Sequence, residues 1–86
     1  MSKKEVLTWE PCIFIAFEWE RCDNNGNGIY TAYFLAYGTI FHRFCVWGCS
    51  EERNTLERLK PLTPCKLRLQ WKRGKKWLLG VEPLQN

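Results

Sequence analysis

The sequence predicts a small all-β domain of five strands, with one short helix between the third and fourth strands. A length of 86 residues is that of one domain, so residues 1–86 are expected to fold together. Apolar side chains alternate with polar ones over much of the chain, which is the period of a half-buried strand. Only residues 50–59 have the composition of a helix.

The first strand is expected to be long and to begin after Pro11. Apolar side chains recur at every second position of residues 13–19. Asp, Asn and Gly then crowd residues 23–28 around the pair Asn25-Gly26, which tolerates positive φ. A hairpin turn is therefore predicted at residues 23–28.

Two further strands are expected at residues 29–37 and 40–47. Both segments are rich in β-branched and aromatic residues, and Gly38 separates them. Large apolar groups occupy both faces of each segment. Periodicity therefore leaves open which face is turned inward.

Residues 50–59 are expected to form the helix, because acidic residues come early and basic residues late. Ser50 could cap a longer version of this helix. Alternatively, Asn54 with Glu57 could form a capping box for its last part. The sequence leaves both caps open, and Pro61 should end the helix.

The last two strands form the clearest hairpin of the sequence. In residues 65–72, the side chains of Cys65, Leu67, Leu69 and Trp71 share one face, and polar side chains occupy the other. This strict alternation predicts a strand with one buried face.

The length of the connecting loop sets the register of this hairpin. A three-residue loop at residues 73–75 pairs each apolar residue with another: Trp71 with Trp77, Leu69 with Leu79, and Leu67 with Val81. A two-residue turn would instead place Leu67 opposite Gly80 and Trp71 opposite Lys76. The apolar pattern favours the longer loop.

This order of elements is the topology of the OB-fold, a five-stranded barrel whose face and loops bind oligonucleotides. The chain resembles bacterial single-stranded DNA-binding proteins and their primosomal relatives across residues 29–82. Three segments carry the resemblance in family order, namely residues 31–36 (TAYFLA), 42–48 (HRFCVWG) and 66–71 (KLRLQW). The resemblance implies an OB-fold-like barrel that binds single strands.

The chain departs from the family pattern in two ways. Thr63-Pro64 stands where the family usually has a glycine turn before the fourth strand. The acidic tail through which the family recruits partners has no counterpart in these residues, so such recruitment is not implied. An SH3-like barrel is the alternative fold, since it also has about five short strands.

Positive charge is concentrated at one end of the sequence. Residues 60–86 contain seven Lys or Arg residues and one acid, Glu82, within a chain of net charge +4. Such a local excess favours a polyanionic partner or an anionic membrane surface.

The basic hairpin is the predicted binding site. Its cations could neutralise successive phosphates, and its tip tryptophans could stack on a base. The predicted nucleic-acid-binding residues are Lys66, Arg68, Trp71, Lys72, Arg73, Lys75, Lys76 and Trp77. Two other interpretations stay open. The cations could be the solvated face of an exposed hairpin stapled by its tryptophans, or the hairpin could bind phospholipid.

The residues that could carry catalysis or bind metal fit neither role well. The five cysteines are odd in number and lie mostly in apolar runs, as reduced, buried thiols do. Cys45-x3-Cys49 lacks the C-x2-C geometry of a zinc knuckle, and His42 should face away from Cys45. Glu18 and Glu20 are expected to be solubilising rather than an acid–base pair. The sequence therefore predicts a non-enzymatic protein with no metal and no cofactor.

A soluble, cytoplasmic protein is expected, because no apolar run reaches the length of a membrane span and no apolar leader follows Met1. The predicted function is sequence-tolerant binding of single-stranded DNA or RNA. The alternative is a protein-interaction or homo-oligomeric β-barrel module. Neither a membrane nor a small-molecule substrate is an expected partner.

Overall fold

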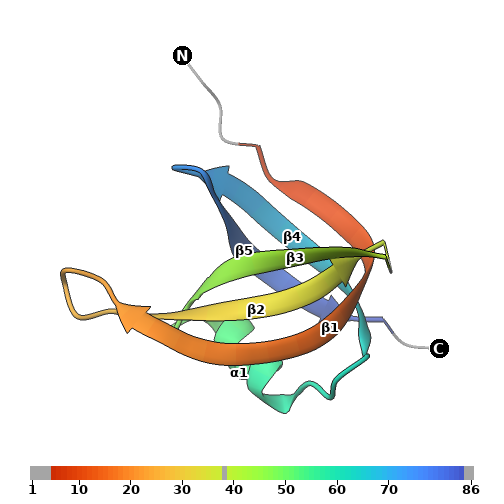
Figure 1. Cartoon of the computed structure of the whole chain (residues 1–86), viewed down its shortest axis with the longest axis horizontal. Coiled ribbons are helices and arrows are strands. Elements are labelled where there is room, and N and C mark those ends of the chain that lie inside the picture. The colour runs from red at the N-terminus through yellow and green to blue at the C-terminus, as the bar shows by residue number, and fades with distance from the viewer. Residues whose placement is uncertain (1–4, 38, 85–86) are drawn as a thin grey trace.

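The five strands close into a barrel in the order β1-β2-β3-β5-β4, with one helix between β3 and β4 (Figure 1). The computed structural model describes residues 5–37 and 39–84. Its elements are β1 (Leu7–Cys22), β2 (Gly28–Ala36), β3 (Ile40–Trp47), α1 (Glu51–Arg58), β4 (Pro64–Lys72) and β5 (Lys75–Pro83). The predicted all-β, OB-fold-like barrel is confirmed, including the place of the helix.

Strand β1 is long because it pairs with two neighbouring strands. Its first part pairs with β4, and from Cys12 onward it pairs with β2. The strand begins at Leu7, so the expected start after Pro11 is wrong. A register shift between Trp9 and Cys12 accommodates the proline, which has no N–H to donate to a ladder.

The turn between β1 and β2 follows the prediction. The Asp23 carboxylate accepts hydrogen bonds from the backbone N–H groups of Asn25 and Asn27, both at 2.8 Å. These hydrogen bonds lower the pKa of Asp23, and the bond from the Asn27 backbone has the largest effect. Gly26 adopts a φ of 85°, as the Asn-Gly pair requires. The resulting hairpin extends beyond the barrel (Figure 1).

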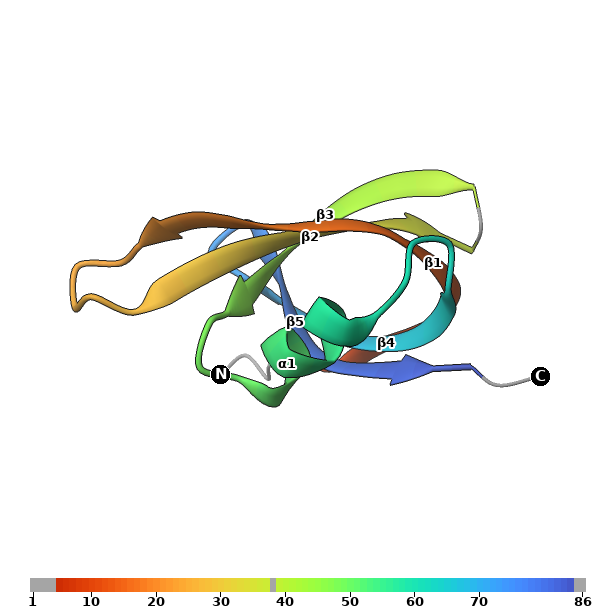
Figure 2. The same cartoon turned by 90° about the horizontal axis from the view of Figure 1, so that it is seen from below.

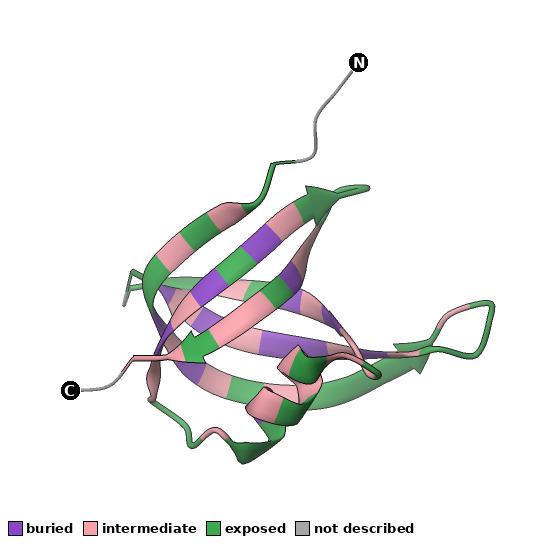
Figure 3. Cartoon of the chain, turned by 180° about the vertical axis from the view of Figure 1, so that it is seen from behind, coloured by how far each residue is buried: buried purple, intermediate pink, exposed green. Residues whose placement is uncertain are grey.

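The inward faces of β2 and β3 are those that place aromatic rings at the centre of the barrel. Phe34 lies 5.4 Å from Phe14 and 5.7 Å from Phe44, measured between ring centroids. Buried residues alternate with more exposed ones along the strands (Figure 3). The buried core cluster consists of Cys12, Phe14, Ala32, Phe34, Ala36, Phe44, Val46, Leu56, Cys65, Leu67, Leu69 and Leu78.

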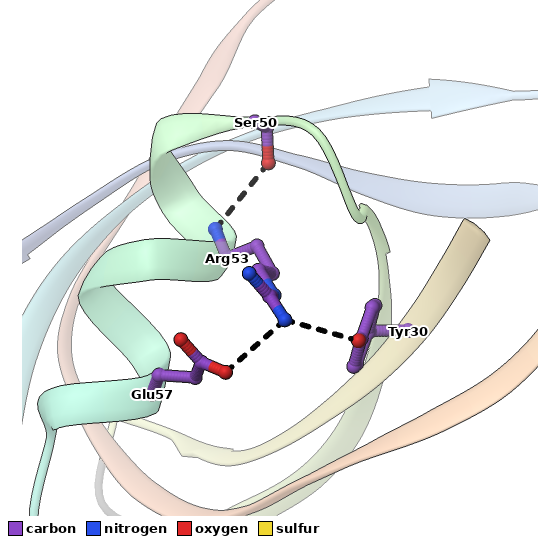
Figure 4. A network of polar contacts seen from close by, with 4 residues as sticks. All are labelled: Tyr30, Ser50, Arg53 and Glu57. Carbon is purple, nitrogen blue, oxygen red and sulfur yellow. Dashed lines mark hydrogen bonds and ion pairs between the residues drawn. The ribbon is translucent and has the colours of Figure 1, made fainter. Parts of the chain in front are cut away.

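Helix α1 packs beside one end of the barrel (Figure 2). Ser50 is its N-cap, since the Ser50 hydroxyl accepts a hydrogen bond from the Arg53 backbone N–H. The Arg53 guanidinium contacts Glu57 at 3.1 Å and donates to the Tyr30 hydroxyl at 3.3 Å (Figure 4). The Arg53–Glu57 pair lies within the helix, whereas the bond to Tyr30 and buried Leu56 fix the helix against the barrel.

The hairpin of β4 and β5 differs from the predicted register near its tip. Leu67 does pair with Val81, but a two-residue turn at Arg73-Gly74 places Trp71 opposite Lys76. The predicted pairs Trp71–Trp77 and Leu69–Leu79 are therefore wrong. A β-bulge leaves Leu79 unpaired in the ladder, and this extra residue reconciles the short turn with the apolar pattern further along.

No helix in residues 5–37 and 39–84 is long and apolar enough to cross a membrane.

Candidate nucleic-acid interface

The tip of the β4–β5 hairpin presents four cations. We call Lys72, Arg73, Lys75 and Lys76 the tip cations. Arg73 and Gly74 have φ values of 54° and 76°, as a tight hairpin turn with two left-handed residues requires. Lys72 and Lys75 lie directly opposite each other in the ladder. Their like charges repel each other unless solvent or an anion screens them. The ion pairs in the described part of the chain are Arg21–Glu20 and Arg53–Glu57, so the tip cations have no carboxylate partner there.

Trp71 offers an exposed ring beside these charges. Its side chain is 52% exposed, and the Lys76 ammonium lies 4.8 Å from the centroid of its ring. The same ammonium lies 5.8 Å from the Phe44 ring. These cation–π contacts hold Lys76 between the tip and the end of the core.

Trp77 lies on the other face of the hairpin. It stacks on Trp47 of β3 with ring centroids 4.7 Å apart and is half-buried. The two tryptophans predicted to act together are therefore separated. Trp71 is exposed and offers a stacking surface beside the Lys76 ammonium, whereas one side of Trp77 is covered by Trp47.

Lys66 and Arg68 lie away from the tip, next to α1. They border a hollow that Glu51, Glu52 and Glu82 also line. The Arg68 guanidinium lies across Gly80, where a Cβ atom would approach its Nε to 2.9 Å. The eight predicted residues thus divide into a tip group of the tip cations and Trp71, the separate Trp77, and Lys66 with Arg68 in a partly acidic setting.

The outer face of β2 and β3 carries further aromatic and basic side chains that the sequence did not single out. Tyr33 and Phe41 stack with ring centroids 5.6 Å apart, and Phe41 is 55% exposed. Arg43 follows on the same face of β3 and is exposed. These residues were missed because the alternation along β2 and β3 did not show which face is outward. Once Phe34 and Phe44 are inside, Tyr33, Phe41 and Arg43 must point out.

A cavity of about 340 Å³ connects this outer face with the hairpin tip. We call it the tip cavity. It lies where β3 and β5 are bridged at a single register position, Cys45 with Trp77. Its lining comes from β1, β2, β3 and the tip: Glu20, Thr31, Phe41, His42, Arg43, Phe44, Cys45, Gly74, Lys75 and Lys76.

His42 and Cys45, which line the tip cavity, are both uncharged at pH 7. The positive charge of the cavity is therefore that of its Lys and Arg side chains. Burial, and to a lesser degree the nearby Lys76 ammonium, lowers the pKa of His42, so the imidazole is neutral at pH 7. Burial raises the pKa of Cys45, so its thiol stays protonated. A hydrogen bond to Glu18 at 2.7 Å is the main reason that the pKa of Tyr33 is raised.

His42 and Cys45 lie on opposite faces of β3, with His42 against the ring of Trp9 at 4.9 Å. Within residues 5–37 and 39–84, no three His, Cys, Asp or Glu side chains are placed to hold a metal ion. All five cysteines are free thiols, and buried Cys12 and Cys65 are paired across β1 and β4. Cys22 and Cys49 are exposed and Cys45 is half-buried, so the expectation of buried thiols is wrong for these three. Burial raises the pKa of Cys65 to about 11.

Compared with protein families, with curated proteins and with solved structures, the chain matches none of them.

Proposed function

We propose that this protein binds single-stranded nucleic acid across the tip cations, Trp71 and the outer face of β2 and β3. One observation carries the proposal. The exposed ring of Phe41 lines the same cavity as Arg43, Lys75 and Lys76, which have no carboxylate partner among the residues that the structure describes. The exposed Trp71 ring lies beside this cavity, 4.8 Å from the Lys76 ammonium. The resemblance to bacterial single-stranded DNA-binding and primosomal proteins supports the same function.

The two kinds of side chain suit the two parts of a nucleotide. Stacking of a base on an aromatic ring contributes about 1–3 kcal/mol and tolerates any base. Phosphates bind Lys and Arg with a strength that falls as salt rises. Unpaired bases are needed for stacking on Trp71 or Phe41, so a single strand fits this surface better than a duplex.

The first test is a tryptophan fluorescence titration with mixed-sequence oligonucleotides of about 16 nucleotides, at about 50 mM and about 200 mM salt. We expect saturable quenching at low salt and weaker binding at the higher salt. Trp71→Phe should remove much of the quenching. Absence of both quenching and binding at low salt would contradict the proposal.

A double variant, Arg73→Asn with Lys75→Gln, tests the tip cations. Asn accepts the positive φ of residue 73 better than Arg does, so this variant removes charge without straining the turn. We expect its affinity at low salt to fall at least tenfold. The matched control, Arg58→Gln with Lys60→Gln, removes the same charge at the end of α1, across the barrel from the β4–β5 turn (Figure 1). It should bind nearly as well as the wild type.

Lys66→Gln completes this series, because Lys66 is a predicted contact that lies near acidic residues. A loss of affinity smaller than that of Lys75→Gln would assign the main contacts to the tip.

A protein-interaction or homo-oligomeric module is the second candidate. It is favoured by the exposed apolar side chains Tyr37, Ile40 and Phe41 at and beside the turn between β2 and β3. Ile40 does not line the tip cavity. Self-association in sedimentation that Ile40→Asp abolishes, without nucleic-acid binding by the wild type, would favour this candidate.

A further inference from the structure

The tip cavity contains a carboxylate that phosphate binding does not explain. Glu20 is the one acidic residue in its lining, as far as the chain is described. A carboxylate beside Arg43 and Lys75 weakens the attraction of the cavity for phosphate. Its presence therefore suggests a ligand group that donates hydrogen bonds.

Glu20 is held in place by its neighbours on the sheet. The Thr31 hydroxyl donates a hydrogen bond to Glu20 Oε1, and the Thr31 side chain is buried, with 6% of the residue exposed. Arg21 Nε lies 3.7 Å from Glu20 Oε2. An ionised carboxylate has about four acceptor positions, so these two contacts leave acceptors free for a ligand.

Beside this acceptor the cavity offers a stacking surface and cations. Phe41 is exposed and backed by Tyr33, and it lines the cavity together with Arg43 and Lys75. A nucleotide has the complementary parts: a flat base, hydrogen-bonding groups on its edge and a phosphate. We propose that the tip cavity binds one nucleobase of a single strand, stacked on Phe41, whose exocyclic amine donates to Glu20. This inference rests on the proposed function.

A hydrogen bond to Glu20 makes the protein selective for bases that carry an amine. Cytosine presents its N4 amine as a donor, which is the base edge that Glu recognises. Thymine presents carbonyl oxygens, which repel a carboxylate, on both sides of its single N–H group. Both are pyrimidines of similar size, so the comparison isolates the edge that faces Glu20.

The experiment compares oligo(dC) with oligo(dT) of about 16 nucleotides by fluorescence anisotropy at pH 8 and low salt. The wild type should bind oligo(dC) roughly five- to tenfold more tightly. In Glu20→Gln the amide both donates and accepts, so the ratio of the two affinities should fall to about one.

Glu18→Gln is the matched control. Glu18 lies on the same strand and accepts a hydrogen bond from the Tyr33 hydroxyl, but it does not line the tip cavity. Both variants lose one negative charge, so both should bind the two oligonucleotides somewhat more tightly. Only Glu20→Gln should change the ratio.

Equal binding of the two oligonucleotides by the wild type would overturn this inference and leave the proposed function intact. A ratio that Glu18→Gln changes as much as Glu20→Gln does would also overturn it. Absence of binding to either oligonucleotide would overturn the proposed function as well. The wild-type ratio is decisive even if Glu20→Gln does not fold.

Discussion

His42 stands at the end of the core, edge-on to Trp9 and near Phe44, on the same side of β3 as the buried aromatic rings. Burial first, and the Lys76 ammonium second, lower its pKa in the folded protein. In the unfolded chain, His42 takes up a proton near pH 6.5, where an unperturbed His titrates. The folded state therefore binds fewer protons than the unfolded state just below that pH.

The sign of the effect on stability follows from this difference. The contribution of His42 to the free energy of unfolding is constant above the unfolded pKa. It is lost as the pH falls from about 6.5 toward the lowered folded pKa. We expect the wild type to lose more stability between about pH 8 and about pH 5.5 than His42→Gln does, measured by urea unfolding. An equal loss in both proteins would contradict the assignment.

At the level of elements, the N-cap of α1 separates two interpretations that the sequence left open. Ser50 accepts from the Arg53 N–H and donates to the Trp47 carbonyl at 2.6 Å, whereas Asn54 is an exposed residue inside the helix. Ser50→Ala should therefore lower the free energy of unfolding by about 1 kcal/mol. Asn54→Ala should change it by less than about 0.5 kcal/mol. Urea unfolding of both variants checks this, and the reverse order would place the cap at Asn54.

In the β4–β5 hairpin, the sequence predicts the buried face of β4 but not the register between the two strands. The alternation of Cys65, Leu67 and Leu69 predicted the buried face of β4 correctly, because side-chain direction along one strand depends only on local geometry. The register with β5 depends also on the turn and on any bulge. Because of the bulge at Leu79, Trp77 lies on the outer face of β5, where it stacks on Trp47. That stacking partner is 30 residues away in the sequence, so no local pattern reveals it.

At the scale of the whole molecule, the order of elements was enough to predict the fold, while the site was only partly predictable. The tip cations are neighbours in the sequence, so the sequence alone could group them. The tip cavity combines Glu20 of β1, Thr31 of β2 and Phe41 of β3 with Lys75 of β5. It exists only because the barrel closes between β3 and β5, and the inward faces of β2 and β3 had to be known before its lining could be named.

The distribution of charge over the molecule makes a quantitative prediction for salt dependence. A single strand that contacts Z phosphates through Lys and Arg gives a slope of about −0.7Z when log K is plotted against log salt concentration. Four tip cations predict a slope of roughly −3, and contacts from Lys66 and Arg68 as well would predict roughly −4. Removing two tip cations with Arg73→Asn and Lys75→Gln should reduce the steepness by about 1.4.

The Arg58→Gln, Lys60→Gln control lowers the net charge equally, so it distinguishes contacts from the general field of the protein. A contact releases counterions from the strand, whereas a distant charge acts through a field that is screened within about 10 Å at 0.1 M salt. The control should therefore keep the wild-type slope. If the control and the tip variant flatten the slope equally, binding follows net charge alone, and the tip cations are a solvated face rather than a phosphate-binding site.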